Sequence, residues 1–260
     1  LSCDRLFIKH DILLSCFICY YTFKYATIFS KLCALKLAFF SNLKLKTKET
    51  RYMKINIKSK LSEFIKQNNL FDDSRIISYL PNITIETDKI KTIMINEVVP
   101  TNTNDDFYSV DKDADYLKTT IPLFDSAGIE VSSINDILDM GIYITNAVKL
   151  PKSEYTITRD TIKLHMPILE EEIKLFKNLE VVMLMGDVAK KSFNMITKKH
   201  IKKNVIPSIS TYKLRNNELY YDNLRVFPSY IMTGGNILIE KSKFEMASED
   251  IKKMFEIING

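Results

Sequence analysis

The chain has 260 residues, of which 46% are hydrophobic and 27% are charged, with a net charge of +5. This composition is typical of a globular protein with a sizeable core, in one large domain or two small ones. The charge is unevenly distributed. Residues 1–52 carry nine Lys and Arg against three Asp and Glu, and residues 53–260 carry 28 against 29. The near-neutral body excludes nucleic-acid binding through overall charge, so affinity for phosphate must come from local patches.

Residues 1–52 differ from the rest of the chain. All four cysteines lie before Met53, and all ten methionines lie at or after it. The apolar run 12–23 is shorter than the roughly 18 residues of a membrane span, and acidic residues near the start argue against a secretory signal. Three interpretations stay open: translation that begins at Met53, a membrane-associated hairpin, or a helical extension. We therefore divide the chain into an N-terminal extension, 1–52, and an α/β domain, 53–260.

The cysteines also bear on metals and location. Cys16 and Cys19 form a lone CxxC without a partner pair, which is weak support for a metal site. The body has no cysteine, which fits a reducing compartment. We therefore expect a cytoplasmic protein.

From Lys89 onward, strand patterns alternate with helix patterns. Apolar runs predict four strands, and the intervening periodic segments predict five helices. A Tyr-rich stretch predicts a hairpin around Asn216 and Asn217. The expected strands are 92–96, 142–145, 180–186 and 224–229, and the expected helices are 116–127, 134–140, 159–176, 187–197 and 247–258, with Asp187 as an N-cap.

Alternation of this kind predicts a three-layer α/β/α fold with a central, mainly parallel, four-stranded sheet. In such folds ligands bind outside the carboxyl ends of the strands. That rule selects the residues that follow each strand, which are Asn96, Glu97 and Pro100, then Asn146, then Gly186 and Asp187, and finally Phe227, Pro228 and Ser229.

Four stretches in this order resemble the uracil-DNA glycosylase superfamily, and together they span most of residues 90–258. They are MINEVVP, YITNAVKLPK, PILEEEIKLFKNLEVVMLMGDVAKKSF and VFPSYIMTGGN. The resemblance implies an enzyme that hydrolyses the N-glycosidic bond of uracil, or another deaminated base, flipped out of DNA. It also implies that Asn146 reads uracil, because an amide offers an acceptor beside a donor and uracil presents the complementary pair.

Further roles follow from the same resemblance. Glu97, with Asn96, would act in catalysis by positioning water or supporting the cationic sugar. Phe107 or Tyr108 would stack on the extruded base, with Pro100 beside it. Ser229, Lys149 and Lys152 would contact the DNA backbone, and Ser229 also the substrate. The expected partner is DNA that contains uracil or a related lesion, and the protein is expected to be a monomer.

The chain also departs from the superfamily pattern. Phe227 stands where a His usually contacts uracil O2, which removes a donor to the leaving group. Val98, Val99 and Pro100 replace smaller residues after the first motif, where the superfamily pattern brings the backbone close to the base. Leu150 and His165 stand where two ligands of an iron–sulfur cluster would be expected, so we expect no cluster, metal or other cofactor, and interpret His165 as a helix or core residue.

Other features have simpler interpretations. The lysines of TKKHIKKN, 197–204, fit either a solvated helix end or a DNA contact. The acidic run 105–115 lacks the Gly and terminal Glu of a calcium loop, so we interpret it as a polar loop. Two alternatives to an enzyme stay open: a catalytically weak or inactive nucleic-acid-binding module on the same fold, and an unrelated α/β protein that binds another small ligand.

Overall fold

The computed structural model describes residues 54–71, 74–111, 113–154 and 156–260. Within the chain, Tyr52–Gly260 forms one compact unit. The predictions for residues 1–52, and for a start at Met53, lie outside the described residues. Among the described helices, none is long and apolar enough to cross a lipid bilayer.

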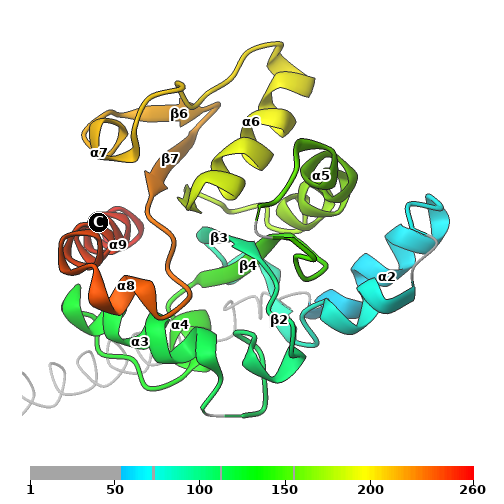
Figure 1. The fold of residues 1–260 in the computed structure, drawn as a ribbon, viewed down its shortest axis with the longest axis horizontal. Coiled ribbons are helices and arrows are strands. Elements are labelled where there is room, and N and C mark those ends of the chain that lie inside the picture. Colours follow the sequence, from blue (N-terminus) through cyan, green and yellow to red (C-terminus); the bar gives the residue numbers. More distant parts are fainter. Residues whose placement is uncertain (1–53, 72–73, 112, 155) are drawn as a thin grey trace, which may run out of the picture. The chain divides into compact units, whose positions relative to one another are not determined.

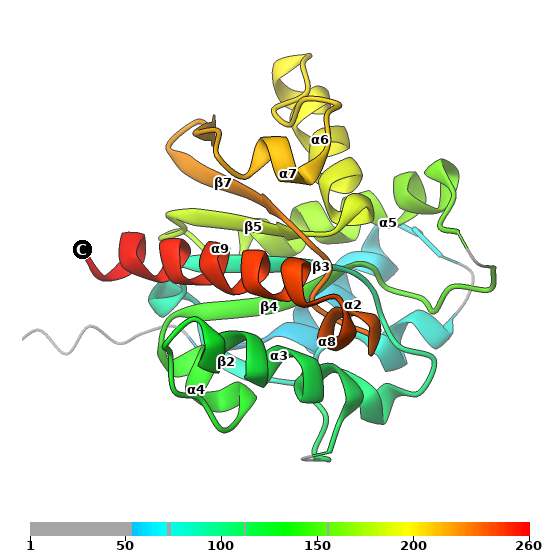
Figure 2. The same ribbon diagram turned by 60° about the vertical axis from the view of Figure 1, so that its left-hand side comes forward.

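The centre of the fold is a mostly parallel sheet (Figures 1 and 2). In the described residues it has five strands in the order β4-β3-β5-β7-β6. The first four are parallel to one another, and β6 pairs antiparallel with β7 at the edge. The α/β class and the parallel core are confirmed, whereas the expected number of four strands misses β6. The bounds are β3 (Thr92–Val98), β4 (Ile142–Val148), β5 (Val181–Met185), β6 (Leu219–Tyr221) and β7 (Leu224–Ser229).

The edge hairpin turns at Asp222 and Asn223, because Tyr221 pairs with Leu224 and leaves two residues between the strands. Asp222 has a φ of 51°, a left-handed conformation that Asp tolerates better than most residues. The prediction of a turn at Asn216 and Asn217 is wrong. Those residues follow the short helix α7 (Thr211–Leu214), and the Asn217 N–H donates to the Leu214 carbonyl at its end.

Helices cover both faces of the sheet. Helices α3 (Asp115–Ser126), α4 (Ile134–Asp139) and α9 (Lys241–Asn259) lie on one face, and α5 (Arg159–Lys174) and α6 (Asp187–Ile201) lie on the other (Figure 2). Helix α2 packs against α5. The three layers are therefore those that the sequence predicts. The remaining elements are β1 (Lys54–Asn56), α2 (Ile57–Gln67), η1 (Ser74–Tyr79), β2 (Thr84–Glu86), η2 (Thr87–Lys89), η3 (Thr103–Asp105) and α8 (Asn236–Ile239).

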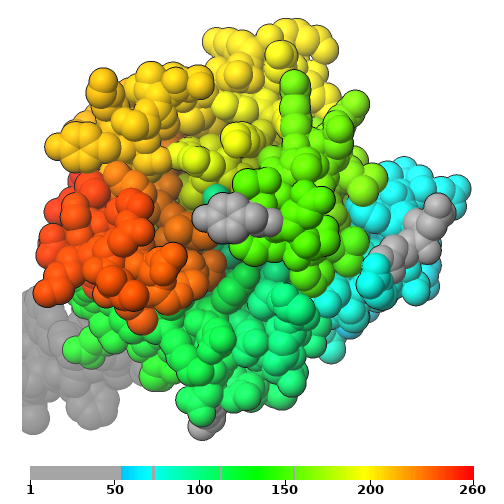
Figure 3. Space-filling view, in the orientation of Figure 1, coloured from blue at the N-terminus to red at the C-terminus, as the bar shows by residue number. Residues whose placement is uncertain are grey.

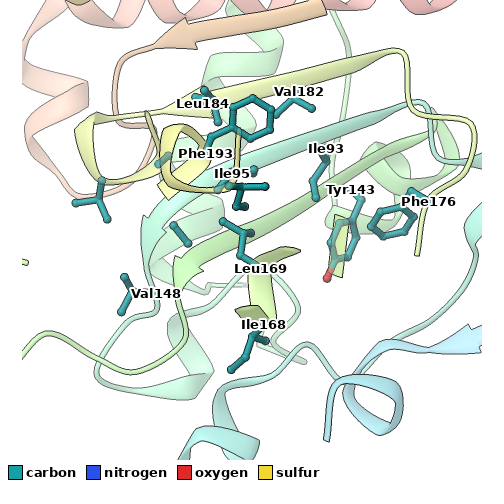
Figure 4. Packing of buried hydrophobic residues seen from close by; sticks show 14 of the residues in the cluster. Ile93, Ile95, Tyr143, Val148, Ile168, Leu169, Phe176, Val182, Leu184 and Phe193 are labelled. Atoms are coloured by element: carbon teal, nitrogen blue, oxygen red, sulfur yellow. The ribbon is translucent and has the colours of Figure 1, made fainter. Parts of the chain in front are cut away.

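The side-chain alternation of the strands divides the core into two clusters. Ile93 and Ile95 of β3 pack toward α5 and α6 with Tyr143 of β4 (Figure 4). Met94 and Ile144 pack on the opposite face, toward α3 and α9. Two positions further along each strand, this second face receives Asn96 and Asn146, which are direct partners in the register. The pleat therefore brings two amides together at the carboxyl ends of neighbouring strands.

Helix α6 begins one residue earlier than the predicted cap suggests. Gly186 is the N-cap, with a φ of 104°, and Asp187 is the first helical residue. The prediction of Asp187 as the N-cap is therefore wrong by one position. Its carboxylate still lies in the first turn, where a negative charge interacts favourably with the helix dipole. Its Oδ1 forms an ion pair with Lys190 at 2.7 Å.

Candidate functional site

Four polar residues meet at the carboxyl ends of β3 and β4. We call Asn96, Asp106, Asn146 and Thr233 the amide cluster. The Nδ2 of Asn96 donates to the Oδ1 of Asn146 at 2.9 Å, and the Nδ2 of Asn146 donates to the Oδ1 of Asp106 at 3.2 Å. The Thr233 hydroxyl donates to the Oδ1 of Asn96 at 3.2 Å. Segments from four parts of the chain thus converge on one hydrogen-bond chain, in which the two amides and Thr233 are buried and Asp106 is half-buried.

The order of donors and acceptors in the amide cluster is fixed by Asp106. Its Oδ1 accepts from both the Phe107 N–H and the NH₂ of Asn146, so this oxygen is an acceptor toward Asn146. The carbonyl oxygen of Asn146 then faces Asn96, which must present its own NH₂. This leaves the Asn96 oxygen for the Thr233 hydroxyl. Each member therefore has one role as donor or acceptor toward its neighbour.

Asp106 is distinct from the other acids of its loop. Burial raises the pKa of its carboxyl group, against the lowering effect of hydrogen bonds from the Phe107 N–H and from Asn146. Asp111, Asp113 and Asp115 are exposed. The sequence analysis treated the whole run as a polar loop and missed Asp106. Only its position directly before Phe107 separated it from its neighbours.

Glu97 lies beside the amide cluster but contacts a different element. Its Oε1 accepts a hydrogen bond from the Val188 N–H at 3.0 Å, in the first turn of α6. A Cβ at Gly186 would collide with the Glu97 side chain, so the glycine makes room for this contact. The carboxylate is half-buried, and it satisfies one of the N–H groups that have no partner within the helix.

The two aromatic residues expected to stack on a base are packed within the protein. Phe107 is fully buried, with its ring 5.0 Å from that of Tyr116. The Tyr108 hydroxyl donates to the Ile144 carbonyl at 2.8 Å, and the ring stacks on Tyr143 at 5.8 Å. The Asn146 side chain itself is buried, with 4% of the residue exposed. In this arrangement neither ring is free to stack on a base, and the Asn146 amide is covered.

Residues 107–232 match the model of the uracil DNA glycosylase superfamily. The chain carries a domain of this superfamily. Its fold is therefore glycosylase-like, as the sequence motifs predict. No curated protein matches the chain. The matched segment includes Asn146, Phe227 and Ser229, whereas Asn96, Glu97 and Asp106 precede it.

Within the superfamily domain, the two lysines expected at the DNA backbone are in different environments. Lys149 is 1% exposed, and its Nζ donates to Glu172 Oε2 at 2.5 Å and to Thr145 Oγ1 at 2.6 Å. Glu172 also accepts from the Tyr143 hydroxyl at 2.6 Å. In this structure the Lys149 charge therefore joins β4 to α5 and does not face a phosphate. Lys152 is exposed and lines a cleft.

The side chains of the last superfamily motif, Phe227 and Ser229, are also buried in the protein. Ser229 is fully buried, and its hydroxyl donates to Asp250 Oδ2 at 2.7 Å. Phe227 is 4% exposed and packs in the α3–α9 core, with the Arg225 guanidinium 4.4 Å from its ring centre. Pro100 is half-buried in the loop after β3. Neither Ser229 nor Phe227 presents a polar atom to a ligand in this arrangement.

The segments that follow β3, β4, β5 and β7 meet on one face of the superfamily domain (Figure 3). Two clefts open among these segments, of about 720 Å³ beside α6 and about 530 Å³ beside the start of α5. The larger one contains Arg159, Lys190, Lys191 and Lys198 against a single acid, Asp187. No member of the amide cluster lines either cleft.

The lysines of residues 197–204 do not act as one patch. Lys198 lines the larger cleft, whereas the Nζ of Lys199 forms an ion pair with Glu170 at 2.7 Å. Lys202 ends helix α6 in a left-handed conformation. The described residues contain no group of three or more His, Cys, Asp or Glu side chains that could hold a metal ion.

His165, at a position where a cluster ligand was considered, is a core residue of α5. It is 1% exposed, its Nδ1 accepts from the Lys149 N–H at 3.2 Å, and its ring lies 4.9 Å from that of Phe71. Burial, aided by the Lys149 charge, lowers the pKa of the imidazole from 6.5 to about 4. Leu150 is half-buried and lines the same cleft as His165.

The depressed pKa of His165 predicts a loss of stability in weak acid. The unfolded chain takes up a proton near pH 6.5, and the folded protein does so only near pH 4. The contribution of the neutral His165 to the stability of the fold is therefore complete above pH 6.5 and is lost as the pH falls toward 4. The free energy of unfolding should therefore be about 2 kcal/mol lower at pH 5 than at pH 7 because of His165 alone.

Urea unfolding at pH 7 and pH 5 measures this loss. The variant His165→Asn retains an acceptor for the Lys149 N–H but does not titrate in this range. Its unfolding free energy should fall less between the two pH values than that of the wild type. An equal fall in both proteins would show that His165 does not contribute to the acid sensitivity.

Proposed function

We propose that the protein is a uracil-DNA glycosylase-like hydrolase that cleaves the N-glycosidic bond of uracil, or of another deaminated base, flipped out of DNA. The observation that supports this most is the position of the Asn146 amide. It lies at the carboxyl end of β4, next to Asn96, in a domain of a superfamily whose membership implies a DNA substrate. Ligands of parallel α/β folds bind at this edge.

The amide has the pattern needed to read uracil. Uracil offers an N3–H donor beside an O4 acceptor, so N3–H would donate to the Oδ1 of Asn146 while Nδ2 donates to O4. Cytosine inverts this pattern and would leave both groups unpaired. Because the amide is buried, a base within a duplex cannot reach it and must leave the stack. Asp106 must also move from its present bond to Asn146.

Cleavage of the glycosidic bond builds positive charge on the sugar and negative charge on the departing uracil. The Glu97 carboxylate, at the end of β3 and beside the first turn of α6, would support the sugar cation or orient the attacking water. Phe227 offers no donor to the leaving base. One missing donor of this type costs about 2–4 kcal/mol of transition-state stabilisation, so we expect slow turnover.

Contacts to the DNA backbone would come from exposed cations near the same face. Lys152 lines the smaller cleft, and Lys191 and Lys198 line the larger one. These local charges matter because residues 53–260 are nearly neutral as a whole. Their contribution should weaken as the salt concentration rises.

A second candidate function is a nucleic-acid-binding module that does not catalyse. It is favoured by the last superfamily motif, in which Phe227 is packed in the core and Ser229 is bonded to Asp250. In this case the backbone contacts would persist, and base excision would be absent.

Incubation of the full chain with single- and double-stranded DNA that carries one uracil separates these functions. Excision would leave an abasic site and an alkali-labile strand break. DNA binding that weakens with salt, without such breaks, would favour the binding module. If neither occurs, a different ligand of the strand ends is indicated. Parallel substrates with hypoxanthine and xanthine test other deaminated bases.

A further inference from the structure

Within the amide cluster, Asn146 already bonds to a donor and an acceptor of the kinds that the edge of uracil presents. Asn146 receives a donor, the Nδ2 of Asn96 at 2.9 Å, and meets an acceptor, the Oδ1 of Asp106 at 3.2 Å. These are the two functions that uracil would present as N3–H and O4. Without uracil, Asn146 therefore already meets one donor and one acceptor, and its Oδ1 has a second lone pair with which it could accept N3–H while Asn96 stays bonded.

The two partners differ in how they are held. Asn96 is fully buried on β3, in register with Asn146 and fixed on its other side by Thr233. Asp106 lies in a loop whose preceding residues, 101–104, are exposed. The Phe107 ring, fully buried, anchors the loop directly after it. Of the two partners of Asn146, Asp106 is therefore the one that can leave without disturbing the sheet.

We infer that Asp106 is an internal latch, whose carboxylate takes the place of uracil O4 on Asn146 and competes with the base for the site. This inference rests on the proposed function. A base enters when the carboxylate leaves, and the carboxylate returns when the free base is released. The latch therefore weakens binding of free uracil and favours release of the product. It leaves the preference for uracil over cytosine unchanged, because both bases must displace the same group.

Burial of the latch is consistent with a competitor that is easily displaced. A carboxylate in this position is partly stripped of water, and burial raises the pKa of Asp106. When the loop opens, the carboxylate regains its hydration. Its bond to Asn146 therefore contributes only the modest net strength of an ordinary hydrogen bond.

Variants of Asp106 test the latch directly. Asp106→Ser removes the acceptor from Asn146 and keeps a hydroxyl that can accept from the Phe107 N–H, whereas Asp106→Asn retains an acceptor oxygen. Asp105→Ser is the matched control, since the bonds of the described Asn146 side chain run to Asn96 and Asp106. Titration with free uracil should give roughly tenfold tighter binding for Asp106→Ser. Asp106→Asn and Asp105→Ser should stay near the wild type, and the uracil-to-cytosine ratio should not change.

A measurement on the wild type provides a second test. The Phe107 N–H donates to the same Asp106 oxygen at 2.9 Å. Hydrogen exchange at Phe107 should therefore become faster when uracil saturates the site. Unchanged exchange, or uracil binding by Asp106→Ser that is equal to or weaker than wild type, would overturn the latch.

The outcomes also separate the latch from the proposed function. If Asn146→Ala abolishes uracil binding while Asp106→Ser fails to strengthen it, only the latch is rejected. Should neither the wild type nor Asp106→Ser bind or excise uracil, the latch and the uracil form of the proposed function are both rejected. Binding by Asp106→Ser alone would support both.

Discussion

Replacement of Lys149 by methionine should lower the free energy of unfolding by about 3–5 kcal/mol, because it leaves the buried Glu172 carboxylate without its cation. Both side chains are at most 1% exposed, and their charged atoms lie 2.5 Å apart. The Tyr143 and Thr145 hydroxyls also donate to Glu172, at 2.6 and 2.9 Å. These two bonds alone do not neutralise a charge removed from water.

Two further variants make this prediction specific. Lys149→Met combined with Glu172→Gln removes both charges and should recover part of the lost stability. Lys118→Met breaks an ion pair with Asp115 that has a similar distance of 3.0 Å but side chains that are 54% and 66% exposed. That change should stay within about 0.5 kcal/mol. Denaturant unfolding of the four proteins measures these differences, and equal losses for Lys149→Met and Lys118→Met would contradict the prediction.

If the protein excises uracil as proposed, Asn146→Asp should reduce that excision by about 100-fold or more. An ionised carboxylate has no donor for uracil O4, so the base would face two acceptors. Loss of a specific hydrogen bond in a buried polar site has effects of at least this size on substrate selection. The rate of strand breakage in uracil-containing DNA is the measurement.

The controls separate recognition from folding. Asn146→Ala removes the amide without adding a charge and should lose activity to a similar degree. Lys198→Ala, in the cleft beside α6, should change the rate far less and mainly alter its salt dependence. Thermal melting of each variant identifies unfolded protein. A folded Asn146→Asp enzyme with the wild-type rate would show that Asn146 does not read the base.

Several features of this fold follow from local sequence alone. The apolar run at 92–96 lies within β3, the run at 224–229 coincides with β7, and the periodic segment from Arg159 forms α5. Strand and helix patterns depend on neighbouring residues, and so does the rule that ligands bind at the carboxyl ends of parallel strands. For this reason the α/β class, the superfamily and the positions of Asn96 and Asn146 at the carboxyl ends of two strands could be predicted.

Whether each polar side chain of the site is buried or exposed depends on residues far away in the sequence. Lys149 is buried because Glu172 lies opposite it on α5, and Ser229 because Asp250 lies opposite it on α9. Asp106 contacts Asn146 across 40 positions in the chain. A charged or polar side chain is buried only where its partner has been brought within hydrogen-bond distance. The sequence by itself determined which residues reach the carboxyl edge of the sheet, and only the tertiary structure decided which of them face one another and which could face a ligand.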